Sequence, residues 1–112
     1  MRLFRKQDAQ MTRATAPMFQ GTVYIQGLTA DLSQQLGAAV VSFRDGARNT
    51  FHLHDGDQIL VVTEGEGTIA TESEELPMSA GDVVFIPAGE SHWHGARPGH
   101  SMTHISIIAA TK

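Results

Sequence analysis

The sequence contains no cysteine, and this absence removes two structural options at once. Disulfide bonds cannot stabilise the fold, and a metal site built on thiolates is excluded. Any bound metal must therefore be held by nitrogen or oxygen ligands. A chain without disulfides suits a reducing compartment, so we expect a cytoplasmic protein.

The sequence also lacks long apolar runs and an overall excess of basic residues. No stretch approaches the roughly 20 apolar residues that a transmembrane helix needs, so we expect no membrane partner. The net charge is −4, and the basic residues gather in the first thirteen positions. Because the rest of the chain is acidic, no basic face is left for phosphate backbones, and nucleic acid is not an expected partner.

Helical periodicity is scarce as well, and short strand-like runs fill most of the 112 residues. The runs are separated by turns that contain glycine or proline, and they lie at 22–25, 37–43, 59–63, 68–71, 83–86 and 102–110. We predict a hairpin-type turn at 64–67, where Glu-Gly-Glu-Gly ends one apolar run. Many short strands with frequent turns indicate an all-β, single-domain antiparallel β-barrel or jelly roll.

The predicted domain spans residues 1–112, with an N-terminal arm at 1–17 and the barrel at 18–110. A chain of this length buries roughly 60–70% of the surface that it exposes when unfolded, so its core is modest. We therefore expect a homodimer or homotetramer, in which assembly adds to the core. The residues predicted to form the core are Phe43, Phe51, Leu60, Val62, Phe85 and Ile86.

The six histidines are unevenly placed, and four of them form two pairs with H-x-H spacing. His52 and His54 are two residues apart, so both side chains leave the same face of a strand. Gln58 can return beside them because Asp55-Gly56-Asp57 is a turn sequence, and His92 follows a second turn at 87–89. The spacing alone is compatible with a metal site and equally with surface histidines.

The same residues lie at the spacing of two known motifs. The first motif reads G-x5-H-x-H-x3/4-E-x6-G, and at its positions the chain has Gly46, His52, His54, Gln58 and Gly65. The second reads G-x5-P-x-G-x2-H-x3-N, and here the chain has Gly81, Pro87, Gly89, His92 and Ala96. Both motifs are those of the cupin superfamily, which the chain resembles over residues 46–96. The resemblance implies a β-barrel with one divalent metal ion on His52, His54, Gln58 and His92.

Gln58 stands where the motif usually has glutamate, and this departure bears on the chemistry. A carboxamide oxygen neutralises no charge, so three imidazoles and one amide leave the ion at about +2. Such a site favours Lewis-acid chemistry and disfavours higher oxidation states. If Gln58 is only a turn residue, the site consists of three histidines.

A closer resemblance is to the small bacterial cupins that include hydroxynitrile lyases. The similar segments lie at 19–23, 46–50, 58–63, 89–96 and 102–105. That group holds manganese or iron on three histidines and a glutamine, so the resemblance implies Mn(II) or Fe(II), with nickel, zinc or cobalt as alternatives. It also implies pocket residues, namely His94, His104, Ala39 and Val41, and Phe51 is a further candidate for the pocket wall.

His94 and His104 are the catalytic candidates, because an imidazole with a pKa of about 6.5 moves protons at neutral pH. The alternative is that each histidine only hydrogen-bonds a ligand or fills the pocket mouth. The expected function is that of a metal-binding cupin with Lewis-acid activity on a small-molecule substrate. The resemblance implies cleavage of a cyanohydrin or a related hydroxy or carbonyl compound. A metal-dependent dioxygenase and a non-catalytic metal- or ligand-binding module are the two alternative interpretations.

Overall fold

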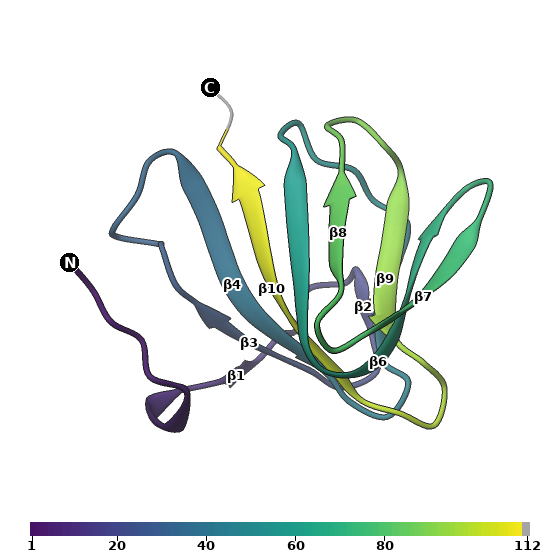
Figure 1. The fold of residues 1–112 in the computed structure, drawn as a ribbon, viewed down its shortest axis with the longest axis horizontal. Coiled ribbons are helices and arrows are strands. Elements are labelled where there is room, and N and C mark those ends of the chain that lie inside the picture. The colour runs from purple at the N-terminus through teal and green to yellow at the C-terminus, as the bar shows by residue number, and fades with distance from the viewer. Residues whose placement is uncertain (111–112) are drawn as a thin grey trace.

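In the computed structural model, which describes residues 1–110, antiparallel strands form one sheet that curls into a half-barrel (Figure 1). The strands are β1 (Thr12–Arg13), β2 (Phe19–Gln20), β3 (Val23–Gly27), β4 (Leu36–Phe43), β5 (Arg48–Asn49), β6 (Gln58–Thr71), β7 (Glu75–Ser79), β8 (Val83–Ile86), β9 (His92–Ala96) and β10 (Met102–Ala109). Their order is β1-β3-β4-β10-β6-β9-β5-β2, and β7 and β8 also pair with β6. The prediction of an all-β barrel is confirmed.

Strand β6 runs for 14 residues through the predicted hairpin turn at 64–67, so that prediction is wrong. Its first part pairs with β10 and β8, and its second part pairs with β7 and β9. Gly65 has a φ of 79°, and the register with β10 shifts nearby, between Thr103 and His104. Glycine tolerates this backbone conformation, and a Cβ here would overlap the Ser101 carbonyl. The Glu-Gly-Glu-Gly segment therefore bends a continuous strand and does not reverse it.

Strands β4, β10 and β6 lie side by side and line the interior with alternate residues. His104 lies opposite Val41 on β4 and Val62 on β6, and all three side chains are buried. Ser106, two residues along the same face of β10, lies opposite Ala39 and Leu60. This register places polar side chains of β10 against an otherwise apolar interior.

Four of the six residues predicted to form the core are part of it, namely Phe43, Leu60, Val62 and Ile86. Phe51 and Phe85 are exposed by 48% and 60%, so their assignment to the core is wrong. Phe85 alternates with Ile86 on β8, and only one face of this strand points inward. Phe51 lies in the loop between β5 and β6, outside any strand.

Part of the segment 1–17 is tied to the sheet. A short 3-10 helix, η1 (Lys6–Asp8), is followed by β1, which pairs with β3. Lys6 forms an exposed ion pair with Glu64 of β6. Residues 1–110 contain no helix with the length and apolar character needed to cross a membrane. The cytoplasmic location and the homodimer or homotetramer stay predictions.

Candidate metal centre

His52 and His92 are held side by side by the backbone. Each donates its backbone N–H to the carbonyl of the other, at 2.9 Å in both directions. The His54 carbonyl accepts a hydrogen bond of 2.8 Å from the N–H of Gly89, which ties this loop to the 87–89 turn. His52 forms an isolated bridge and His54 lies in irregular chain, so the predicted regular strand through both is wrong. The backbone contacts with the 87–92 segment bring the three histidines together.

The three imidazole rings converge. The ring centroid of His52 lies 5.0 Å from that of His54 and 4.4 Å from that of His92. The centroids of His54 and His92 are 5.4 Å apart. One ring nitrogen from each residue lies within 4.8 Å of the other two. An imidazole nitrogen binds a divalent metal at about 2.0–2.1 Å, so nitrogens this close together could share one ion.

Backbone carbonyls fix which nitrogen carries the proton in two of the three rings. His52 Nδ1 lies 2.6 Å from the Thr50 carbonyl, and His92 Nδ1 lies 2.8 Å from the Glu90 carbonyl. A carbonyl oxygen only accepts, so both Nδ1 atoms are protonated and both Nε2 atoms keep a lone pair. Among the described residues, Nε2 of His92 and Nε2 of His54 are buried without a hydrogen-bond partner. These donor atoms fit a metal ion.

Gln58, the first residue of β6, adds a fourth atom of the same kind. Its side chain is 3% exposed, and its Nε2 donates a hydrogen bond of 2.9 Å to Ser106 Oγ on β10. Its Oε1 is buried and has no hydrogen-bond partner within residues 1–110. Buried polar atoms normally have partners, so an orphaned oxygen calls for a ligand. Its role as a metal ligand stays a prediction.

Burial favours the neutral form of His52 and His54. It is the main cause of the lowered pKa of His52; the hydrogen bond to the Thr50 carbonyl opposes it, and His92 and His54 add smaller lowering contributions. Burial also lowers the pKa of His54, and the neighbouring His92 adds to this effect. Neutral imidazole is the metal-binding form, so the lowered pKa values of His52 and His54 favour metal binding at neutral pH.

His94 and His104 form a second histidine pair deeper in the barrel. His104 Nε2 lies 3.2 Å from His94 Nδ1, and both rings pack against Phe43 with centroids 5.4–5.7 Å away. The His94 ring also lies 5.7 Å from that of His52 and 5.8 Å from that of His92. His94 therefore lies between His104 and the cluster of His52, His54 and His92, which is called the ligand cluster below.

Burial dominates the pKa values of this inner pair. It places the pKa of His94 well below the usual value of 6.5, and His104 is the next largest cause. Burial lowers the pKa of His104 to about 4, against a smaller raising effect of its own backbone. Both imidazoles are therefore neutral at pH 7.

The predicted pocket residues lie in two different settings. Val41 is buried opposite His104, and Ala39 lies opposite Ser106 on the same strand. Phe51 is largely exposed and adjoins His52 in the chain. The part that these three residues play in a pocket stays a prediction.

Three residues that contact the site were not predicted from the sequence to lie there. Asn49 accepts a hydrogen bond of 2.8 Å from the backbone N–H of His94, and Phe43 packs against the inner pair. Ser106 holds Gln58. Ser106 shares the alternating face of His104 on β10, and this spacing was the one sequence feature that pointed to it.

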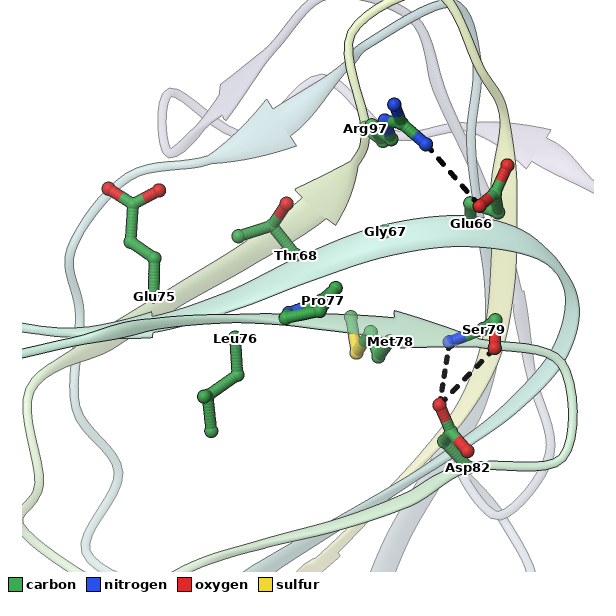
Figure 2. Close-up of a pocket in the computed structure, with 10 residues that line it drawn as sticks. All are labelled: Glu66, Gly67, Thr68, Glu75, Leu76, Pro77, Met78, Ser79, Asp82 and Arg97. Carbon is green, nitrogen blue, oxygen red and sulfur yellow. Dashed lines mark hydrogen bonds and ion pairs between the residues drawn. The ribbon is translucent and has the colours of Figure 1, made fainter.

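A surface pocket of about 490 Å³ lies away from the histidines, beside β6 and β7 (Figure 2). Arg97 lies 3.5 Å from Glu66 there, and the Ser79 backbone N–H donates to Asp82 at 2.8 Å. None of the residues that line it belongs to the candidate metal centre. Arg97, Glu66 and Asp82 each have a partner there, unlike the buried atoms without partners inside the barrel.

Fold and site together define a small antiparallel β-barrel with neutral nitrogen donors that can hold a metal ion. Residues 39–108 match the Cupin domain family, and the chain belongs to this family. It is 41% identical over 97 residues to an (R)-mandelonitrile lyase of Granulicella tundricola, covering 85% of this chain and 74% of that enzyme.

Two further relatives broaden the comparison. A gentisate 1,2-dioxygenase of a Ralstonia species is 40% identical over 58 residues, which cover 51% of this chain but 16% of that enzyme. The solved structure of a cupin-like protein from Thermotoga maritima superposes with a TM-score of 0.86 at 33% identity, covering 93% of this chain and 80% of that one. The expected resemblance to small cupins similar to hydroxynitrile lyases is confirmed.

Proposed function

We propose that the protein is a metal-dependent lyase that cleaves cyanohydrins or related hydroxy compounds, with the ion on His52, His54, His92 and Gln58. The observation that carries the proposal concerns the four buried side-chain atoms that find no hydrogen-bond partner among the described residues. One is Nδ1 of His104, and the other three belong to the proposed ligands: Nε2 of His54, Nε2 of His92 and Oε1 of Gln58. The identity to the (R)-mandelonitrile lyase supports the choice of reaction.

The charge of the proposed ligand set supports Lewis-acid chemistry. All four ligands are neutral, so they leave the full charge of a divalent ion in place. When bound, Mn(II) or Fe(II) would lower the pKa of a substrate hydroxyl and stabilise negative charge on its oxygen. The backbone acceptors of His52 and His92 keep those rings fixed, which prepares the site before the ion arrives.

The inner histidines supply a route for the proton of the substrate hydroxyl. His94 is neutral and its ring lies near those of His52 and His92, so in this proposal its Nε2 accepts the hydroxyl proton while the carbon–cyanide bond breaks, which leaves a carbonyl compound and cyanide. His94 can then release the proton on Nδ1 to His104 Nε2, 3.2 Å away. The surrounding Phe43 and Val41 exclude water from this pair. His94 is thus the residue nearer the ligand cluster, and His104 is its proton acceptor on the far side.

The test is cleavage of mandelonitrile by chelator-treated protein before and after loading with Mn(II), followed by the absorbance of the benzaldehyde formed. We expect activity only in the loaded protein, and a loss in kcat/KM of about 10²-fold or more in His94→Ala. His100→Ala is the matched control, because His100 is a surface histidine that pairs with Glu66. Its activity should equal that of the wild type.

The alternatives give different outcomes in the same assay. Oxygen consumption with gentisate, together with no cleavage of mandelonitrile, would overturn the lyase proposal in favour of a dioxygenase, the activity of one relative. Stoichiometric metal binding with neither reaction would indicate a binding module. A wild type that binds no metal would remove the basis of all three.

A further inference from the structure

We propose that Ser106 is a positioning residue that sets the orientation of the Gln58 carboxamide, and so determines which end of this amide meets the metal ion. The inference rests on the proposed function, because it takes Gln58 as a ligand. It adds a residue that neither sequence motif contains.

The placement of Ser106 follows from the register of β10 against β6. Ser106 lies opposite Leu60, and Gln58 is two residues from Leu60, so Ser106 is the diagonal neighbour of Gln58 on the interior face. Gln58 Nε2 donates to Ser106 Oγ at 2.9 Å. The serine hydroxyl therefore contacts the nitrogen end of the amide and leaves the oxygen end free.

The two ends of a carboxamide have opposite consequences at a metal site. The oxygen carries lone pairs and binds hard cations, whereas the NH₂ group has only donors and repels them. The two ends have nearly the same shape, so packing alone discriminates poorly between the two orientations. When the oxygen end faces the ion, the buried NH₂ group needs an acceptor, and Ser106 Oγ on β10 supplies it.

The unpaired oxygen supports this assignment. Gln58 Oε1 is buried and has no hydrogen-bond partner among residues 1–110. A buried acceptor without a partner is unfavourable, and a reversed amide could pair its oxygen with the Ser106 hydroxyl as donor. The structure instead keeps the NH₂ group on Ser106, and in this orientation the oxygen is left for a ligand.

A carboxylate at position 58 gives a sharp test, because its two oxygens are chemically equivalent and need no orientation. The experiment titrates chelator-treated protein with Mn(II) by isothermal titration calorimetry. In the wild-type background, Ser106→Ala should weaken Mn(II) binding about 10-fold, as expected for an outer-sphere partner of a ligand. In the Gln58→Glu background, the same change should weaken it by less than about threefold, because either oxygen can bind.

Two further variants separate orientation from a general effect on folding. Ser106→Thr keeps the hydroxyl and should restore most of the affinity. Thr103→Ala removes a hydroxyl from the opposite face of the same strand, where it donates to Ser42 Oγ at 3.1 Å, and should leave the affinity unchanged. If Ser106→Ala does not fold, the comparison of Ser106→Thr with Ser106→Val replaces it.

A second measurement does not depend on the metal. In the ¹⁵N spectrum of the metal-free protein, the side-chain NH₂ signals of Gln58 are identified by their absence from the spectrum of Gln58→Glu. Ser106→Ala should shift and broaden these signals.

Equal Mn(II) affinity of wild type and Ser106→Ala would overturn this inference alone. A tenfold loss that persists in Gln58→Glu would also overturn it, because a general loss of packing does not depend on the identity of residue 58. A wild type without Mn(II) affinity would overturn both the metal site and this inference.

Discussion

The ligand cluster and the inner histidine pair are built from the same residue type, a few ångströms apart, and are held by different partners. In the cluster, His52 and His92 each direct Nδ1 at a backbone carbonyl. In the inner pair, His94 and His104 face each other and pack against Phe43. Burial is the main cause of the lowered pKa in His52, His94 and His104.

This difference shows that the hydrogen-bond partner, more than the burial, decides what a buried histidine can do. A carbonyl is a permanent acceptor, so it fixes one tautomer and leaves the other nitrogen free for a metal. A second histidine can donate or accept, so the proton between the two rings can lie on either. The cluster is therefore suited to hold an ion, and the inner pair is suited to hold or move a proton.

The largest expected effect follows from breaking the cluster. His54→Ala removes a nitrogen donor that no described residue satisfies, so we expect Mn(II) affinity to fall by more than about 10²-fold, beyond the range typical of outer-sphere partners. His104→Gln alters the inner pair and should change the affinity by less than about threefold. Elemental analysis and calorimetry of both variants measure the contrast. A similar loss in both would show that the two groups do not act separately.

The three histidines of the ligand cluster could be predicted from the sequence, because a motif with fixed spacing also fixes the local backbone. His52, His54 and His92 were placed by their distances from glycine and proline turns, and these turns bring the residues together. Asn49 and Phe43 contact His94 from 45 and 51 positions away in the chain. Contacts of this kind depend on the order and register of strands, which local patterns do not contain.

The predicted turn at 64–67 failed for a related reason. A Glu-Gly-Glu-Gly segment is compatible with a reversal or with a bend, and the local residues favour neither. The outcome was decided by β10 on one side and β9 on the other, because each part of β6 finds a separate partner. The overall fold could be predicted from alternation and turn frequency, whereas the path of its longest strand required the tertiary contacts.

A smaller effect is expected from the charge state of the inner pair. His104 has a pKa of about 4 in the folded chain and an ordinary value of 6.5 when unfolded. Above pH 6.5 neither state is protonated at this position, and the full stability is present. As the pH falls from 6.5 to 4, the unfolded chain binds the proton first, and the free energy of unfolding drops by about 3 kcal/mol from this residue.

His104→Gln removes this titration, so the metal-free variant should lose stability less steeply over the same pH range. Urea unfolding of both proteins between pH 7 and pH 4 measures the difference in slope. His104 is also a cause of the lowered pKa of His94, so the pKa of His94 should be less depressed in the variant, and this change acts in the same direction on the slope. Parallel profiles would contradict the assignment of a buried, neutral His104.

The smallest expected effect comes from the support of the inner pair. Asn49 Oδ1 accepts the backbone N–H of His94 in the interior, so Asn49→Ala leaves a buried donor without its partner. We expect a loss of about 1–3 kcal/mol in the free energy of unfolding, with Mn(II) affinity within about threefold of the wild type. Gln20→Ala, on an exposed side chain of β2, is the control and should change neither quantity. Because Asn49 contacts His94 and no ligand histidine, a fall in metal affinity as large as that in His54→Ala would show that the inner pair and the cluster form one unit.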